Sequence, residues 1–320
     1  MQIGVFIALF QDRSFEEALD QAVGAGVSAV EIPTGGYVGG KHANPRALVD
    51  DEAARTAFVE QIARRNLTID ALSCHGNPLH PQPQIAREHH DTFQATVRLA
   101  SLLGVDTVIT FSGCPGDGPD ARYPNWVTCP WPPDFQSILE WQWSERVLPY
   151  WREQAALGES QGVRVAIEPH PGFVVYNAET LLRLRAECGP AIGANFDPSH
   201  FFWQSIDPIL AARELRGAIY HVHAKDTRID IANTARNGVL DTKPYTNVAQ
   251  RSWIFRTVGY GHDHLFWKDL ISELRLAGYD RVLSIEHEDS HMSKTEGLRK
   301  AAAFLRECII DEPPPVAWWT

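Results

Sequence analysis

The segment QGVRVAIEPHPG, residues 161–172, carries the sequence pattern that decides the fold. A polar, helix-like stretch ends at Gly162, a short β-branched run follows, and the strand-like run closes on Glu168 and a proline. Glycine is the usual residue in the left-handed position just past a helix, and a continuous apolar run is typical of a parallel strand buried on both faces. The segment is therefore interpreted as the helix-to-strand junction of a βα unit.

The same pattern occurs three more times, in AGVSAVE, LGVDTVI and AGYDRVLSIE at residues 25–31, 103–109 and 277–286. Recurrence of this kind indicates repeated βα units. The other apolar runs complete a set of eight predicted strands, at residues 3–9, 29–32, 68–75, 107–111, 164–168, 192–197, 219–223 and 281–286. Long helices are predicted between them at residues 51–65, 89–103, 138–161, 178–188, 267–276 and 295–308. Two more helix starts are predicted from a capping box at Ser14 and from Asp207 followed by proline.

Eight alternations of strand and helix predict a single (β/α)8 TIM barrel that occupies residues 1–320 as one domain. No linker or shift in composition divides the chain. An open doubly wound sheet is the alternative, but it more usually has a glycine-rich phosphate turn after its first strand, and residues 8–14 form no such turn. Long connections follow the fourth strand, at residues 112–136, and the seventh, at residues 227–263. Both lie at the end of the barrel where active sites are built.

The overall composition argues against several classes of protein. The formal net charge of −11 disfavours a nucleic-acid partner, because such a surface repels the phosphate backbone. Five cysteines without a C-x-x-C pair indicate reduced thiols in a cytoplasmic protein. The opening MQIGVFIALFQD is too short to span a membrane and lacks the basic start of a signal peptide, so no membrane association is expected. The apolar C-terminal PPPVAWWT predicts a homo-oligomer, because a monomer would expose it.

Polar side chains end the last four predicted strands, namely Glu168, Asp197, His223 and Glu286. Because the carboxyl ends of the strands meet at the barrel mouth, these side chains are expected to converge. Buried acids repel one another unless a cation neutralises them. Three carboxylates and one imidazole suit one divalent ion, Mn²⁺ above all, with Mg²⁺, Co²⁺ and Zn²⁺ as alternatives, while the missing thiolates argue against structural zinc. The alternative interpretation is four unrelated polar residues that bond loop amides.

Other polar residues near these strand ends are candidates for substrate binding. They are His75, His200, Lys225, Arg228 and His262, the last in the connection after strand seven, from which it would supply an acid above the site. Glu31 and His170 are weaker candidates. His221 shares a face with His223, because side chains alternate along a strand, but it lies one layer deeper and is predicted to be hydrogen-bonded in the core.

Four motifs, IEPHPG, NFDPSH, HVHAKD and SIEHED in this order, resemble those of the sugar phosphate isomerase/epimerase family of xylose-isomerase-like TIM barrels. That family includes ketose 3-epimerases and inosose dehydratases. The resemblance covers nearly the whole chain and is specific as a set. It implies that Glu168, Asp197, His223 and Glu286 bind one divalent metal ion. In the epimerase branch, the two glutamates at these positions also transfer the proton.

Carbonyl chemistry leads to the same kind of enzyme. A metal chelated by a sugar's carbonyl and its neighbouring hydroxyl acidifies the carbon between them and stabilises the enediolate that forms. One carboxylate can remove the proton and a second can return it. The sequence therefore predicts a divalent-metal-dependent isomerase or epimerase of a keto-sugar or related polyol. The first alternative is a lyase or dehydratase of an inosose or 3-keto-glycoside, because the connection after strand seven is long. Two further alternatives are an AP-endonuclease-like nuclease and a barrel that binds a sugar without converting it.

Overall fold

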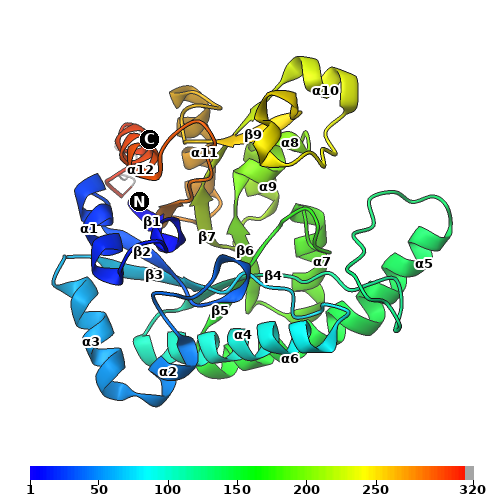
Figure 1. The fold of residues 1–320 in the computed structure, drawn as a ribbon, viewed down its shortest axis with the longest axis horizontal. Helices are drawn as coiled ribbons and strands as arrows, with labels where there is room; N and C mark the ends of the chain where they lie inside the picture. The colour runs from blue at the N-terminus through cyan, green and yellow to red at the C-terminus, as the bar shows by residue number, and fades with distance from the viewer. Residues whose placement is uncertain (314–320) are drawn as a thin grey trace, which may run out of the picture.

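Eight parallel strands close into a barrel in the computed structural model, which describes residues 1–313 (Figure 1). Around the ring the order is β1, β10, β7, β6, β5, β4, β3 and β2. The bounds of these strands are β1 (Gln2–Phe6), β2 (Ala29–Pro33), β3 (Thr68–Ser73), β4 (Thr107–Phe111), β5 (Arg164–Glu168), β6 (Ile192–Phe196), β7 (Ile219–Ala224) and β10 (Val282–Ile285). The predicted TIM barrel is confirmed, and closure of the ring excludes the open sheet.

The strands lie at the predicted positions, and their ends differ by a few residues. The first strand ends at Phe6 because residues Ile7–Phe10 form a 3-10 helix. The segment PPPVAWWT, on which the predicted homo-oligomer depends, lies outside the described residues except for Pro313. All five cysteines are free.

Helices surround the barrel (Figure 1). They are α1 (Phe15–Ala25), α2 (Pro45–Asp50), α3 (Glu52–Ala63), α4 (Pro83–Leu103), α5 (Asp134–Trp141), α6 (Leu148–Gln161), α7 (Ala178–Cys188), α8 (Pro198–Trp203), α9 (Pro208–Glu214), α11 (His264–Leu276) and α12 (Lys294–Arg306). The two predicted start signals are confirmed, since Ser14 and Glu17 form a capping box at α1 and Asp207 caps α9. No helix within residues 1–313 is long and apolar enough to cross a membrane.

Two helices differ from their predicted bounds. α4 begins at Pro83 rather than at residue 89, because proline is well suited to the first turn, where its missing N–H is not needed. The helix predicted at residues 138–161 begins at Asp134 and contains a π-helical segment, Gln142–Val147, between α5 and α6. Within that segment the Gln142 side chain is buried, and its Nε2 lies within hydrogen-bond distance of three carbonyl oxygens of the loop after β4, those of Pro115, Gly116 and Asn125.

The core is apolar between the strands and helices and polar at one end of the barrel. Large side chains such as Trp143, Trp151 and Trp267 are fully buried in the layer between strands and helices. Near the carboxyl ends of the strands, however, the buried side chains include Glu31, Asn195, Asp197, His221 and His223. Buried polar groups are costly unless they find partners. This end of the barrel therefore holds the groups whose burial needs a chemical explanation.

The two predicted long connections are present, and they differ in structure. Residues 112–133, after β4, lead into α5 and project from the side of the barrel (Figure 1). The connection after β7 folds into an antiparallel pair, β8 (Asp226–Ile229) and β9 (Trp253–Arg256), joined through α10 (Ile231–Asn237) and the 3-10 helix Tyr245–Gln250. We call residues 226–263 the excursion. Trp253 stacks on Trp203 of α8, with the ring centroids 4.6 Å apart, so the excursion is packed against the barrel.

Candidate metal centre

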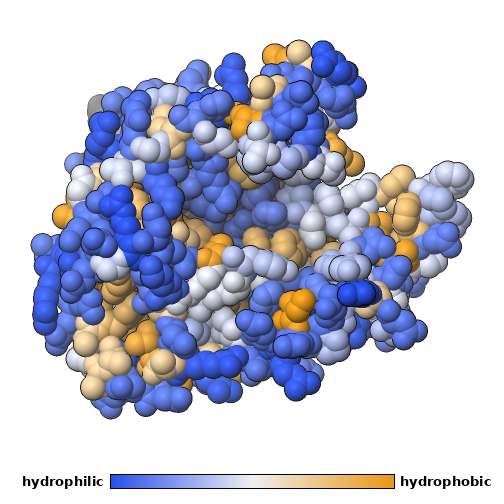
Figure 2. Space-filling model, in the orientation of Figure 1, coloured by the Kyte–Doolittle hydropathy of each residue, from blue (hydrophilic) through white to orange (hydrophobic). Residues whose placement is uncertain are grey.

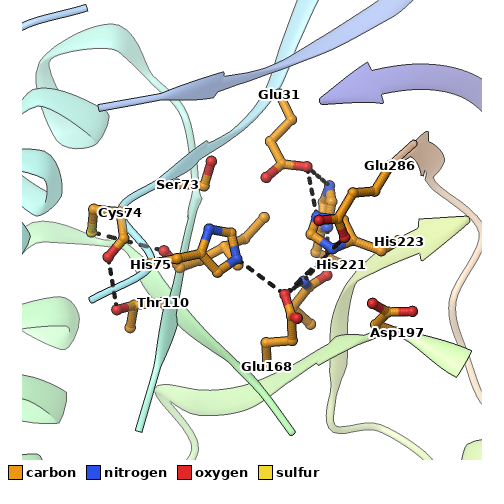
Figure 3. Close-up of polar contacts among 12 residues, drawn as sticks. Glu31, Ser73, Cys74, His75, Thr110, Glu168, Asp197, His221, His223 and Glu286 are labelled. Carbon is orange, nitrogen blue, oxygen red and sulfur yellow. Dashed lines mark hydrogen bonds and ion pairs between the residues drawn. The ribbon is translucent and has the colours of Figure 1, made fainter. Parts of the chain in front are cut away.

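The four predicted ligand residues meet at the carboxyl end of the barrel (Figure 3). Glu168 is the last residue of β5, and His223 lies near the end of β7. Asp197 and Glu286 directly follow β6 and β10. One ligand atom from each residue lies within 4.8 Å of those of the other three. The structure therefore brings together the set that the sequence predicts as metal ligands.

Prolines fix two of these carboxylates at the strand ends. Pro169 and Pro198 have no N–H with which to continue the pairing of β5 and β6. Pro198 also begins α8, and Asp197 caps that helix through Oδ1, which accepts a hydrogen bond from the Ser199 N–H at 2.8 Å. The second oxygen, Oδ2, is buried and has no hydrogen-bond partner within residues 1–313. Asp197 thus has one oxygen fixed by the helix and one left for another partner.

His223 is held in place by an acid from β2. Its Nε2 lies 2.9 Å from Glu31 Oε2, an oxygen that also accepts a hydrogen bond from the Ser284 hydroxyl at 2.9 Å. Donation from Nε2–H to Glu31 leaves Nδ1 facing the Oε2 atoms of Glu286 and Glu168, at 2.9 and 3.4 Å. A carboxylate behind a histidine fixes the ring orientation and the tautomer in metal sites. Glu31 is therefore placed to orient His223 as a ligand.

The charges in this cluster indicate what it can bind. Burial raises the pKa of Asp197, and the carboxylates of Glu168 and Glu286 act in the same direction. Burial alone would lower the pKa of His223, but the carboxylates of Glu31 and Glu286 outweigh it and hold that pKa well above its ordinary value. A divalent cation would balance the acids and take the Nδ1 lone pair in place of a proton.

The donor set fits a hard divalent ion. It offers three carboxylates and one imidazole, and Asp197 Oδ2 and Glu286 Oε2 are buried oxygens without a hydrogen-bond partner in the described part of the chain. Carboxylate-rich sites of this kind suit Mn²⁺ and Mg²⁺. The cluster contains no thiolate ligand.

Two histidines predicted to bind substrate lie against the cluster. His75 Nε2 is 3.0 Å from Glu168 Oε2. His200 Nε2 is 3.4 Å from Glu168 Oε1 and 3.3 Å from Asp197 Oδ2, and both histidines are buried. Burial would raise the pKa of Glu168, but the neighbouring imidazoles of His200, His223 and His75 reverse the effect and hold that pKa well below its ordinary value. Glu168 is thereby kept ionised.

Lys225 also lies at the site. Its Nζ is 3.3 Å from Glu286 Oε1, 2.6 Å from Glu288 Oε2 and 4.2 Å from the centroid of the Phe255 ring. The side chain is only 3 % exposed. Burial would lower the pKa of this ammonium, but the carboxylates of Glu286 and Glu288 outweigh it and raise the pKa well above its ordinary value. A buried ammonium therefore stands beside one of the predicted ligands.

The structure does not bring Arg228 and His262 to the cluster. Arg228 lies in β8 and is exposed, because β8 pairs with β9 away from the barrel strands. His262 Nδ1 lies 2.7 Å from Asp226 Oδ1, and its ring stacks on Phe202 at 3.8 Å between centroids. Asp226 also accepts hydrogen bonds from the backbone N–H groups of Gly259, Gly261 and His262, which fixes this turn of the excursion. The contacts of His262 are those of a residue that fastens the excursion.

Sequence reasoning gave too little weight to Glu31 and did not single out Asn195. Glu31 ends the first repeated unit just as Glu168 and Glu286 end theirs. This shared position was a signal in the sequence that Glu31 also lies at the site. Asn195 precedes Asp197 by two residues and so shares its strand face, and its Nδ2 donates to Glu168 Oε2 at 2.8 Å. The prediction for His221 is confirmed, since both ring nitrogens contact buried polar groups.

A cleft lies beside the cluster. One cavity of about 370 Å³ is lined by Glu286 together with residues that include Phe6, Tyr37 and Lys294. A second cavity of about 340 Å³ shares Lys294 with the first and reaches Phe255 of the excursion. Figure 2 shows the molecular surface hollowed beneath the region of α8 and β9, with many hydrophilic residues in the hollow. Cavities of this size suit a small molecule.

The fold and the strand-end residues define the class of protein. Residues 19–308 match the family model described as the xylose isomerase-like TIM barrel, so the chain belongs to this family, as its motifs predict. It is similar to the uncharacterised protein YfiH of Bacillus subtilis (strain 168), with 42% identity over 298 residues that cover 92% of this chain and 95% of that protein.

Two further comparisons are more distant. Inosose dehydratase of Geobacillus thermodenitrificans (strain NG80-2) is 26% identical over 154 residues, which cover 47% of this chain and 50% of the relative. The solved structure of a D-tagatose 3-epimerase-like protein superposes with a TM-score of 0.63 at 17% identity, covering 96% of this chain and 98% of the other. The structural likeness supports the fold.

Proposed function

We propose that this protein is a divalent-metal-dependent enzyme that transfers a proton next to the carbonyl group of a keto-sugar or keto-inositol, with epimerisation or isomerisation as the outcome. The observation that carries the proposal is the convergence of Glu168, Asp197, His223 and Glu286, with ligand atoms within 4.8 Å of one another. Membership in the xylose isomerase-like family makes a sugar-modifying enzyme the general class. The adjoining cleft is large enough for one small sugar.

The four residues of the cluster would hold one divalent ion, for which we propose Mn²⁺. When bound, such an ion polarises the carbonyl group of the substrate and stabilises the negative charge that develops on its oxygen. Glu31 would keep His223 in the tautomer whose Nδ1 is free to bind. Lys225, His75 and His200 are the proposed contacts to substrate hydroxyl groups, because their polar atoms lie against the cluster.

Glu168 and Glu286 are the proposed acid and base. They come from β5 and β10, which are separated in the ring by β6 and β7, so their carboxylates approach the cluster from different sides. One carboxylate takes the proton from carbon, and the electron pair of the C–H bond moves toward the carbonyl oxygen. The other carboxyl group then gives a proton to the opposite face, which inverts that carbon. Either carboxylate can act as the base, because the pKa values of both Glu168 and Glu286 lie below their ordinary values.

A second candidate reaction is elimination of water, as in a dehydratase. It is favoured by Lys225, whose buried ammonium lies 3.3 Å from Glu286 Oε1. After a carboxylate removes the proton, the electron pair of the broken C–H bond would expel the hydroxyl group on the next carbon. The ammonium would stabilise the departing hydroxyl by hydrogen bonding, and the carboxyl group that took the proton would return it to that hydroxyl, which leaves as water. The similarity to inosose dehydratase supports the same candidate.

The proposal is tested by solvent exchange and product analysis. Metal-loaded protein is incubated in deuterated water with a panel of unphosphorylated keto-sugars and keto-inositols, and the products are analysed by mass spectrometry and NMR. We expect deuterium on the carbon beside the carbonyl. Inversion of that carbon identifies an epimerase, and a moved carbonyl group identifies an isomerase. A product lighter than its substrate by about 18 mass units, the mass of one water molecule, identifies a dehydratase.

Variants connect the exchange to the two glutamates. Glu168→Gln and Glu286→Gln should lose about 10²–10⁴-fold in turnover, because an amide cannot carry the proton. Glu273→Gln is the matched control, since Glu273 is a buried glutamate paired with Arg213 between α11 and α9, outside the barrel. It should keep full turnover. Absence of exchange and product with every compound, in protein shown to contain metal, would overturn the proposal.

A further inference from the structure

A chain of polar contacts runs through the barrel core beneath the metal centre. Asn195 Nδ2 donates to Glu168 Oε2 at 2.8 Å, and Asn195 Oδ1 lies 2.7 Å from His221 Nδ1. His221 Nε2 lies 2.9 Å from Asp70 Oδ2. Asn195 and His221 are at most 1 % exposed, and Asp70 is 7 % exposed. The chain thus links a residue of β3 to a predicted metal ligand on β5 through β7 and β6.

The contacts fix the direction of the two hydrogen bonds that Asn195 makes. Its Nδ2 donates to Glu168 Oε2, so the NH₂ end of the amide faces that carboxyl group. The carbonyl end of that amide then faces His221, whose Nδ1 must carry the hydrogen. The Nε2 atom of His221 lies 2.9 Å from Asp70 Oδ2 and 3.8 Å from Glu31 Oε2, and these are charge contacts rather than hydrogen bonds. Asp70 therefore supplies the carboxylate at the far end.

The amide group of Asn195 serves two residues of the centre. Its Nδ2 also lies 3.1 Å from His223 Nδ1. If the amide turned over, its oxygen would face the Glu168 carboxylate, and that contact would become repulsive. Donation from His221 Nδ1 to Asn195 Oδ1 opposes that turn, because the reversed amide would place NH₂ against N–H.

The depth of these groups argues for a specific role. Replacing a buried polar set by well-packed apolar residues is often neutral or stabilising, so its presence is not explained by stability alone. Within residues 1–313, the lower end of this chain of contacts pairs with Arg281, whose guanidinium is 4.0 Å from Asp70 Oδ1 and also pairs with Asp106. The upper end meets Glu168, so the functional residue that the contacts reach is a predicted metal ligand.

We propose that Asp70 and His221 are positioning residues that act through Asn195 to hold the carboxylate of Glu168 at the metal centre. Asp70 fixes the His221 ring, His221 fixes the orientation of the Asn195 amide, and the amide fixes Glu168 Oε2. The consequence for turnover rests on the proposed function, whereas the consequence for metal affinity does not need any substrate.

The test compares metal affinity, kinetics and stability in a set of variants. Asp70→Ala removes the carboxylate that contacts His221, Asp70→Asn keeps a polar group of the same shape there, and His221→Gln replaces the ring that contacts Asn195. Asp106→Ala is the matched control, because Asp106 pairs with Arg281 but does not contact His221. Affinity is measured by calorimetric titration with Mn²⁺, and thermal unfolding reports on the fold.

Asp70→Ala and His221→Gln should bind Mn²⁺ about 10–100-fold more weakly, which is the usual effect of losing an outer-shell partner. Asp70→Asn should recover most of the affinity, and Asp106→Ala should match the unmodified protein. Where a substrate is known, kcat should fall by up to about 10²-fold with KM little changed, because displacement of a catalytic group acts on the chemical step. A purely structural role would lower the unfolding temperature and leave the Mn²⁺ affinity as it was.

Unchanged Mn²⁺ affinity in folded Asp70→Ala and His221→Gln would overturn the proposal. If the first variant does not fold, Asp70→Asn and His221→Gln still decide it. If the unmodified protein binds no metal, the proposed function fails, and crystal structures of the variants decide the inference separately. If the variants leave the position of the Glu168 side chain and the orientation of the Asn195 amide unchanged, the inference is refuted. A displaced Glu168 carboxylate would support it. Metal binding without turnover of any sugar would contradict only the proposed function and would leave this inference standing.

Discussion

The two halves of the barrel contribute to the centre in different ways. All four residues of the proposed metal site lie in or directly after the later strands, β5, β6, β7 and β10. The earlier strands supply side chains that hold those ligands, namely Glu31 on β2 against His223, and His75 after β3 against Glu168. Both kinds of residue are buried polar groups at the same end of the barrel. The difference teaches that burial alone does not separate a ligand from the residue that orients it.

The long connections show the same division. The side chain of Gln142 anchors the loop after β4 by bonding three carbonyl groups of that loop. The loop contributes no residue to the cluster. The excursion after β7 brings Phe255 over Lys225, which contacts Glu286. Asp226 closes the base of the excursion through its bonds to Gly259 and Gly261, and Trp253 packs the excursion against Trp203 of the barrel.

The largest effect is expected from removing a ligand of the later half. Asp197→Ala and His223→Ala should lose the divalent metal, with affinity reduced by more than the roughly 100-fold upper limit for outer-shell residues. The reason is that each change removes a donor that no neighbouring group replaces. Elemental analysis of purified protein and titration with Mn²⁺ measure the loss. Full metal content in both variants would contradict the site.

An intermediate effect is expected from the earlier half. Glu31→Gln should weaken Mn²⁺ binding by about 10–100-fold while the protein stays folded, because the amide can accept from His223 but carries no charge. Titration calorimetry measures the affinity, and circular dichroism checks the fold. Glu60→Gln, which removes an exposed acid of α3, is the control and should have no effect. If Glu31→Gln lost as much affinity as His223→Ala, the division between ligand and orienting residue would be wrong.

The smallest effects on metal binding are expected from the two connections. Asp226→Asn and Gln142→Leu should each cost about 1.5–3 kcal/mol of unfolding free energy, since each removes buried hydrogen bonds to the backbone. Neither should change Mn²⁺ affinity. Only Asp226→Asn should raise KM, because the excursion bears Phe255 beside Lys225. Denaturant unfolding and steady-state kinetics make the comparison, and an equal rise in KM for Gln142→Leu would show that the loop after β4 also reaches the substrate.

The sequence was sufficient to predict the barrel and the four side chains that meet at its mouth, because their signals are local. Glycines such as Gly162 mark helix ends, and Glu168 and Glu286 occupy the same place at the end of a repeated unit. A closed ring of parallel strands then brings those places to one end. Local signals plus one topological rule thus predicted which side chains meet.

Contacts between distant segments could not be predicted in this way. Glu31 and His223 are 192 residues apart, and their hydrogen bond depends on the exact rotation of two strands in the closed ring. The pairing of β8 with β9 depends on a register between two short runs with no repeated pattern. His262 was expected above the site, but its position is set by Asp226, a residue whose sequence neighbours give no sign of that contact.

The long separation between Glu31 and His223 has a kinetic consequence for folding. Contacts between residues far apart in the chain form late, because the entropy of closing a long loop must be overcome first. His223 acquires its orienting partner only when β2 is in place, and the ring that fixes β2 is completed by the pairing of β1 with β10. Capture of the ion at native affinity would therefore mark the last stage of refolding, and the bound ion would stabilise only chains that have reached it.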